Sequence, residues 1–240
     1  MNTSPLVSAA RDLCAALKPA RFLSDTVACV YNPLEYAAGP HETYLRSFGG
    51  GKKRCLFLGM NPGPWGMAQT GIPFGEIEHV RSWMGISGTV RPPEKTHPRK
   101  PVSGFSCTRS EVSGRRFWGL MKKRYPAAGD FFAEHFVANY CPLLFLDSSG
   151  RNITPDKLSK EQRNLLEEAC NLHLFRTVEI LGPEYLVGVG LYAEKKMKTL
   201  FSDEYHILSI LHPSPASPKA NRGWEEEAVR ALVEAGVWTE

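Results

Sequence analysis

The stretch KRCLFLGMNPGPWGMAQTGIPFGE, Lys53 to Glu76, holds the first evidence on the fold. Its opening residues, Lys53 to Met60, form a short apolar run that is typical of a buried β-strand. From Gly59 onward it contains five glycines, three prolines, an Asn, a Gln, a Trp and a Phe. A connecting turn needs few glycines, so this composition favours a strand that ends in a ligand-binding loop.

The same strand pattern recurs along the chain and alternates with helical patterns. Three further apolar runs are His135–Cys141, Tyr185–Gly190 and His206–Leu211. Helical periodicity covers Ser113–Tyr125, Ser159–Leu181, Leu191–Phe201 and Gly223–Gly236. Continuous apolar strands separated by helices predict a parallel sheet in an α/β layer fold. We expect one domain over residues 1–240, because no internal repeat or low-complexity linker divides the chain.

Several residues predict where helices begin and end. Ser4 and Pro5 are typical of an N-cap and a first helical residue. Ser159 and Gln162 have the spacing of a capping box. Gly236 is a natural stop for the last helix.

Composition narrows the class of protein. The chain has 240 residues, a formal charge of +4 and a sequence pI near 8.7, which is compatible with an anionic partner. No apolar run approaches the roughly 18 residues of a membrane span, and the N-terminus lacks the pattern of a secretory signal. We therefore expect an intracellular protein, cytoplasmic in a bacterium or nuclear in a eukaryote. The six cysteines have no C-x-x-C spacing, so we expect reduced thiols and neither a metal site nor a cofactor.

Polar loops follow three of the predicted strands, where parallel sheets bind their ligands. In the first loop, Gly59, Gly63 and Gly66 allow close approach of the backbone, but G-K-[ST] and G-x-G-x-x-G motifs are both absent. A narrow slot for a flat, neutral ring remains, with Phe74 to stack on it and Asn61 to hold a water or a ligand edge. The alternative is a structural loop with its aromatic rings in the core.

The other two loops carry an amide and a proline-rich segment. Asn139 ends the second strand, either as a turn residue or as an amide that pairs with a pyrimidine edge. HPSPASPKANRGW, His212 to Trp224, has the proline spacing of a stiff extended finger, and Lys219 and Arg222 add positive charge. Such a finger suits contact with a nucleic-acid backbone, whereas a proline-rich connector is the alternative.

Basic runs are the least specific signals in the sequence. They are RPPEKTHPRK at residues 91–100, the pair at Arg115 and the run at Lys122. Each is compatible with a path for a phosphate backbone and equally with a solvated surface.

Three of these motifs together resemble the single-strand-selective monofunctional uracil-DNA glycosylases, within the uracil-DNA glycosylase superfamily. They are GMNPGPWGMAQTGIPFGE, VANYCPLLFL with SGRN following, and HPSP with its downstream GWE. The likeness runs from about Phe22 to the last helix. It implies a three-layer α/β/α fold around a central, mostly parallel four-stranded sheet, and a monomer that acts on uracil-containing single- or double-stranded DNA.

The resemblance also implies roles for individual residues. Asn61 matches the amide that positions water, and His212 matches the histidine that stabilises the departing base. The positions that match the base pocket are Met60, Gly63, Phe74 and Asn139. The wedge that fills the space left by a flipped base matches Pro213, Ser214, Pro215, Ala216, Ser217, Pro218, Lys219, Asn221 and Arg222. Ala216 stands where relatives tend to have a long basic residue, which leaves the strength of the wedge open.

The implied function is a DNA repair glycosylase that flips uracil and 5-hydroxymethyluracil out of DNA and hydrolyses the N-glycosidic bond. An amide such as Asn61 is no strong base, and no Asp or Glu occupies the first turn of the glycine-rich loop. Bond breaking is therefore expected before water adds, with His212 donating to uracil O2. No amine nucleophile stands in the motifs, so we expect an abasic product without lyase activity.

Substrate choice is predicted from Gly63, which has no side chain. We expect a backbone wall beside uracil C5, with space for an ordered water that a thymine methyl would displace and a hydroxymethyl group would replace. The ranking of uracil, 5-hydroxymethyluracil and deaminated purines stays open. Two other functions also stay open: a non-catalytic nucleic-acid-binding module on the same fold, and a small-molecule enzyme such as a nucleoside hydrolase.

Overall fold

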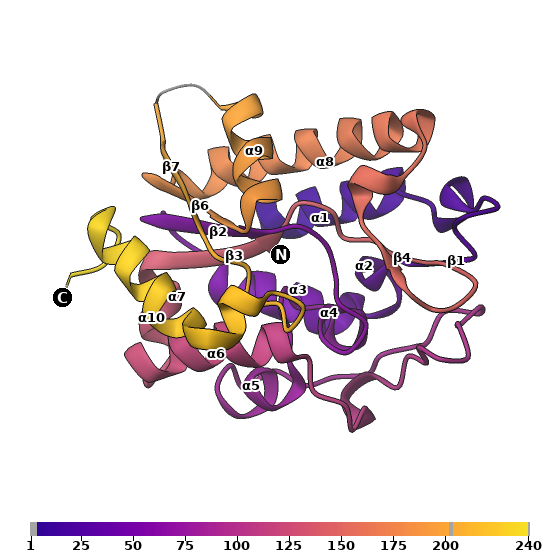
Figure 1. Ribbon diagram of the computed structural model, residues 1–240, viewed down its shortest axis with the longest axis horizontal. Helices are drawn as coiled ribbons and strands as arrows, with labels where there is room; N and C mark the ends of the chain where they lie inside the picture. Colours follow the sequence, from indigo (N-terminus) through magenta and orange to yellow (C-terminus); the bar gives the residue numbers. More distant parts are fainter. Residues whose placement is uncertain (1–3, 202–203, 240) are drawn as a thin grey trace.

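The central sheet consists of four parallel strands, as predicted (Figure 1). The computed structural model describes residues 4–201 and 204–239. In sheet order β3-β2-β6-β7, the strands are β3 (His135–Asn139), β2 (Cys55–Gly59), β6 (Tyr185–Val189) and β7 (His206–Ile210). Every residue of β2 is buried, which explains its unbroken apolar sequence.

Helices cover both faces of this sheet and complete a three-layer α/β/α arrangement. In Figure 1, the upper layer contains α1 (Pro5–Ala16), α8 (Lys160–Leu181) and α9 (Leu191–Leu200). The lower layer contains α6 (Val112–Arg124), α7 (Ala128–Glu134) and α10 (Pro218–Glu234). The remaining short helices are α2 (Pro33–Tyr36), α3 (Ala38–Phe48), α4 (Met67–Thr70) and α5 (Ile77–Ser82), with 3₁₀ turns at Pro19–Phe22, Gly104–Ser106 and Pro155–Lys157.

A second, antiparallel sheet was not predicted. It has the order β1-β4-β5, with β1 (Cys29–Tyr31), β4 (Leu144–Leu146) and β5 (Asn152–Ile153). Its strands are two or three residues long, too short for alternation of apolar and polar residues to develop. This sheet carries the segment around Asn152 to the open end of the central sheet.

The helix ends partly follow the prediction. Pro5 opens α1, but the Ser4 side chain makes no capping hydrogen bond. Ser159 caps α8 by accepting from the Gln162 backbone N–H at 3.2 Å, as predicted. The Gln162 side chain does not complete the box, because its amide donates to the Phe22 carbonyl at 2.9 Å.

The last helix begins earlier than the sequence pattern indicates. Helix α10 starts at Pro218, and Gly223 interrupts its regular geometry. Ser217 caps this first turn by accepting from the Ala220 N–H at 3.3 Å, and Pro218 suits the first helical position. The predicted extended finger is therefore only the loop from His212 to Ser217, and the residues after it are helical.

Among the described residues, no helix is long and apolar enough to cross a membrane.

Candidate active site

A cleft of about 400 Å³ opens beyond the carboxyl ends of β2, β3 and β7. It brings together all six residues that the sequence assigned to chemistry or base binding: Met60, Asn61, Gly63, Phe74, Asn139 and His212. Ser214 and Pro215 of the predicted wedge line the same cleft. The volume suits a small flat ligand.

Strand register places Asn139 against the glycine-rich loop. Gly59 and Asn139 are paired residues at the ends of β2 and β3. A Cβ on Gly59 would collide with the Asn139 Oδ1 and would lie 2.8 Å from the Phe74 ring. Asn139 is only 9% exposed, and its Nδ2 donates to the Met67 Sδ at 3.1 Å. The absent side chain at Gly59 thus lets an amide and an aromatic ring meet at one wall of the cleft.

Phe74 has an unusual backbone conformation. Its φ of 52° is the only positive value for a non-glycine residue in the part of the chain that the structure describes. Its ring stacks on Phe117 at 4.7 Å with an interplanar angle of 18°. Gly114 of α6 lets the Phe74 carbonyl approach, because a Cβ there would collide with that oxygen. Strained backbone held by its surroundings is typical of functional sites, and here it fixes the ring as a wall of the cleft.

Asn61 lies where the first loop meets the segment after β3. Its Nδ2 donates to the Leu143 carbonyl at 3.4 Å. Backbone hydrogen bonds from Tyr140 to Gly59 and from Cys141 to Met60, both 2.9 Å, hold the two segments together. Within the described residues the Asn61 Oδ1 accepts no hydrogen bond, so it remains available to hold a water or a ligand group.

His212 approaches from the other side of the cleft, after β7. Its ring lies 6.2 Å from the Phe74 ring, and its Cβ packs 3.2 Å from the position of a Cβ on Gly190. Burial lowers the pKa of His212, which favours the neutral imidazole. A neutral ring still donates one N–H hydrogen bond.

Glu111 also lines the cleft, and the sequence analysis did not identify it. Its Oε2 accepts from the Trp65 N–H at 3.1 Å, 46 residues away in the chain. A Cβ on Gly63 would collide with this carboxylate, so the predicted backbone wall with open space beside Gly63 is wrong. Burial raises the pKa of Glu111, although the Trp65 N–H and the charge of Lys100 oppose that rise. An acidic residue just before a helix is common, and nothing in the sequence connects this one to the loop.

The predicted wedge is braced from within the protein. Arg116 of α6 donates to the Pro213 carbonyl at 3.2 Å and to the Asn221 Oδ1 at 2.9 Å. The Asn221 Nδ2 donates to the Pro215 carbonyl at 2.8 Å, so this amide organises the loop. Ser214 accepts from the Ala216 N–H.

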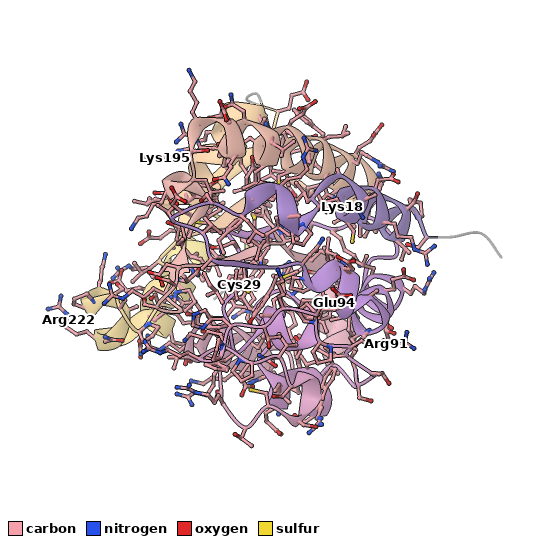
Figure 2. The ribbon with its side chains drawn as sticks, turned by 90° about the vertical axis from the view of Figure 1, so that its right-hand side faces the viewer. Lys18, Cys29, Arg91, Glu94, Lys195 and Arg222 are labelled. Atoms are coloured by element: carbon pink, nitrogen blue, oxygen red, sulfur yellow. The ribbon has the colours of Figure 1, made fainter. Side chains whose placement is uncertain are left out.

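The two cations of the wedge differ. Lys219 lies 3.4 Å from the Glu227 carboxylate. Arg222 forms no ion pair with another described residue, and Figure 2 shows its side chain projecting from the edge of the molecule. Arg222 is therefore the wedge cation with the freer access to an anion.

Trp65 and Phe74 do not fill the core, as the alternative interpretation of the first loop required. Both rings are only partly buried. Lys100 and Arg109 lie over the Trp65 ring, 4.9 and 4.2 Å from its centroid. Among the described residues, no three His, Cys, Asp or Glu side chains are grouped so that they could share a metal ion.

Comparisons with known proteins identify the family of the chain. A sequence model of the Uracil DNA glycosylase superfamily matches residues 47–233. The single-strand selective monofunctional uracil DNA glycosylase of Bos taurus is 49% identical over 89% of this chain and 80% of its own length. Its counterpart from Rattus norvegicus is 47% identical over 89% of this chain and 78% of its own length.

A solved structure supports the fold independently. The crystal structure of wild-type Pedobacter heparinus SMUG2 is similar with a TM-score of 0.65 and 17% identity, over 96% of this chain and 99% of that one. The sequence matches and the fold lead to one assignment: this chain belongs to the uracil DNA glycosylase superfamily, in the family of single-strand selective monofunctional uracil-DNA glycosylases.

Proposed function

We propose that this glycosylase removes uracil and 5-hydroxymethyluracil from single-stranded and duplex DNA and leaves an abasic site. The observation that carries the proposal is the convergence of Asn61, Phe74, Asn139 and His212 on one cleft. These side chains come from three segments, at the carboxyl ends of β2, β3 and β7, and supply a water-holding amide, a stacking ring, a base-reading amide and a hydrogen-bond donor.

Base reading follows from the chemistry of the Asn139 amide. One carboxamide can accept from uracil N3–H and donate to O4, whereas cytosine presents the opposite pattern at both positions. Stacking on Phe74 contributes about 1–3 kcal/mol toward holding an extruded base. Extrusion itself costs a few kcal/mol in a duplex and less in a single strand.

Hydrolysis proceeds with bond breaking first. The C1′–N1 bond breaks, its electron pair stays on uracil, and positive charge develops on the sugar. A neutral His212 donates a hydrogen bond to uracil O2 and stabilises the anion, for which a preorganised donor contributes about 3–4 kcal/mol. Water held by Asn61 then forms the new bond to C1′, and the proton that it loses passes through solvent to the uracil anion, which leaves as neutral uracil. The described residues that line the cleft include no lysine, which fits a reaction without a Schiff base and hence without a lyase step.

Acceptance of 5-hydroxymethyluracil follows from the pair of Gly63 and Glu111. The glycine leaves the wall without a side chain of its own, and the Glu111 carboxyl provides a polar group at that wall. A hydroxymethyl group can hydrogen-bond to such a carboxyl. A thymine methyl would cover the carboxyl and offer it no hydrogen bond beyond the one from the Trp65 N–H, which is costly, so thymine should be rejected.

The test uses fluorescent oligonucleotides with one uracil, single-stranded and duplex, followed by alkali cleavage. Asn61→Ala should lose most excision while it still binds the oligonucleotide. His212→Ala should slow single-turnover excision by about 10²–10³-fold. Asn164→Ala and His206→Ala remove the same residue types from exposed positions outside the cleft and should stay near wild-type rates.

Product formation separates this function from its alternatives. A non-catalytic module would bind the oligonucleotide and yield no alkali-labile site. A nucleoside hydrolase would turn over free deoxyuridine at a rate independent of salt, whereas a DNA enzyme loses affinity as salt rises.

A further inference from the structure

A group of cations lies beside the cleft, outside the residues to which the proposed function assigns a role. Arg99, Lys100, Arg109 and Arg151, called the basic cluster below, line an open depression together with Ser149 and Gly150. They come from three separate segments of the chain. The basic run at residues 91–100 and the SGRN segment thus meet in space, although neither could be assigned a role from the sequence.

None of the four cations has a carboxylate partner among the described residues. Other surface cations form ion pairs with carboxylates, as in Lys123–Glu225 and Arg176–Asp12. Two neighbouring carboxylates, Asp147 and Glu111, accept hydrogen bonds from other groups. The Asp147 Oδ1 accepts from Ser149 at 2.7 and 2.8 Å and from the Arg151 backbone N–H at 2.9 Å, and Glu111 accepts from Trp65.

The cations are held close together despite their like charge. Burial and the neighbouring charge of Arg109 lower the pKa of Lys100. The supporting segments are fixed: the Tyr31 hydroxyl donates to the Lys100 carbonyl and accepts from the His97 N–H, both at 2.7 Å. Arg99 donates to the Ser149 carbonyl at 3.2 Å. Fixed cations that form no ion pair with a described carboxylate are the arrangement that binds an external polyanion.

Two connections join the basic cluster to the cleft. Lys100 and Arg109 lie over the Trp65 ring, and the backbone N–H of Trp65 donates to Glu111 in the cleft wall. Arg151 immediately precedes Asn152, which lines the cleft. The segments at residues 99–100 and 149–151 lie on the side of β1 and β4, opposite α10 (Figure 1). The cleft is lined by Asn152 next to Arg151 and by Ser214 and Pro215 of the predicted wedge, so it lies between the basic cluster and the wedge.

We propose that the basic cluster binds backbone phosphates of the DNA strand that flanks the extruded nucleotide, on the side away from the wedge. The proposal rests on the proposed function, because it assumes that a DNA strand delivers the base to the cleft. These contacts would bind the protein to a single strand without requiring a complementary strand. Phosphate contacts of this kind set position and affinity and leave the chemical step unchanged.

The experiment measures binding of a uracil-free, fluorescein-labelled single-stranded DNA by anisotropy at several KCl concentrations. Arg99→Gln/Arg151→Gln removes two cations that neither lie over the Trp65 ring nor line the cleft themselves. For single strands, each phosphate contact makes the fall of log K with log salt steeper by about 0.7. The slope of the double variant should therefore be less steep than the wild-type slope by about 1.4. The same relation gives about a 5-fold loss of affinity per contact at 0.1 M salt.

Two controls isolate the charge of the cluster. Arg99→Lys/Arg151→Lys keeps both charges and should retain the wild-type slope. Lys18→Gln/Lys195→Gln removes two exposed lysines that lie apart from Arg222 and outside both depressions, and it should leave the slope unchanged (Figure 2). An unchanged slope in the Arg99→Gln/Arg151→Gln variant, or an equal change in the lysine control, would overturn the proposal.

Excision assays show whether the contact lies on a flank of the lesion. The Gln variant should need more uracil-containing strand for half-maximal rate, while its single-turnover rate at saturating enzyme stays at the wild-type value. That penalty should vanish when one flank of the oligonucleotide is truncated, and a penalty that survives truncation of both flanks would contradict the proposal. If the wild-type protein excised no uracil, the proposed function would fail, and the salt slopes would still report on the cluster.

Discussion

Glu111 packs against Gly63, although the two residues are far apart in the sequence. The carboxyl occupies the space that a side chain at position 63 would need. The sequence could predict that Asn61, Phe74, Asn139 and His212 lie at one edge of the sheet, because each lies at or beyond the end of a predicted strand, and all four line one cleft. Glu111 could not be found in this way, because its role depends on a tertiary contact with the Trp65 backbone.

This contact leads to a prediction on substrate choice. In Glu111→Ala, kcat/KM on 5-hydroxymethyluracil should fall about 10-fold more than on uracil, because one hydrogen bond to the C5 substituent contributes about 1–1.5 kcal/mol. Single-turnover assays on the two bases in the same sequence context measure the ratio. Glu78→Ala, at an exposed position of α5, is the matched control. An equal fall on both bases would remove Glu111 from C5 recognition.

The contact between α6 and the glycine-rich loop depends on a single glycine. A Cβ on Gly114 would collide with the Phe74 carbonyl, whereas on Gly119 of the same helix its nearest neighbour would be 3.9 Å away. Gly114→Ala should therefore push the helix from the loop, lower the free energy of unfolding by about 1–3 kcal/mol and impair excision. Gly119→Ala should keep activity and gain up to about 1 kcal/mol from helix propensity. Urea unfolding and excision assays on the two variants test this difference. Equal stability and equal excision rates in Gly114→Ala and Gly119→Ala would contradict the proposed role of the contact.

The brace between α6 and the wedge predicts a difference between DNA forms. Arg116→Gln removes hydrogen bonds to the Pro213 and Ser214 carbonyls and to Asn221, so the wedge loop should become less ordered. Excision of uracil from duplex DNA should fall about 10-fold, and excision from a single strand should change little, because only the duplex requires unpairing. Arg115→Gln, at the neighbouring exposed position, is the control. An equal loss on both DNA forms would mean that Arg116 does not act through the wedge.

The strands that could be predicted are those with an apolar run of about five residues. The four strands of the central sheet are recognisable because their apolar runs are continuous or nearly so, and β2 is buried at every residue. Strand β4 lies in the equally apolar CPLLFL segment, but its partners β1 and β5 are distant in sequence and very short. Pairing across such distances is determined by tertiary packing, so local sequence could not predict the second sheet.

Across the whole molecule, two buried histidines and one partly buried histidine connect stability to pH. They are His41, His135 and His173, and burial is the main cause that lowers the pKa of each to about 4. In the unfolded chain these histidines bind a proton as pH falls below about 6.5, whereas in the folded protein they bind it only near pH 4. These groups therefore contribute their full stability above pH 6.5, and this contribution is lost progressively as pH falls toward 4.

The size of this effect can be predicted and checked. Between pH 7.5 and 5.5, each histidine should remove about 1.3 kcal/mol from the free energy of unfolding, so the three together should remove about 4 kcal/mol. Urea titrations at pH 7.5, 6.5 and 5.5 measure this loss. Burial also lowers the pKa of His212, which adds to the loss in the same direction. His41→Gln keeps a side chain able to donate to the Gly71 carbonyl, to which the His41 Nδ1 is bonded at 2.7 Å, and should reduce the loss by about 1.3 kcal/mol. The carboxylates whose pKa is lowered, such as Glu76, act in the same direction but mainly below pH 5. A wild-type protein equally stable at pH 7.5 and 5.5, or a His41→Gln variant with the full pH dependence, would show that these histidines are not held neutral by the fold.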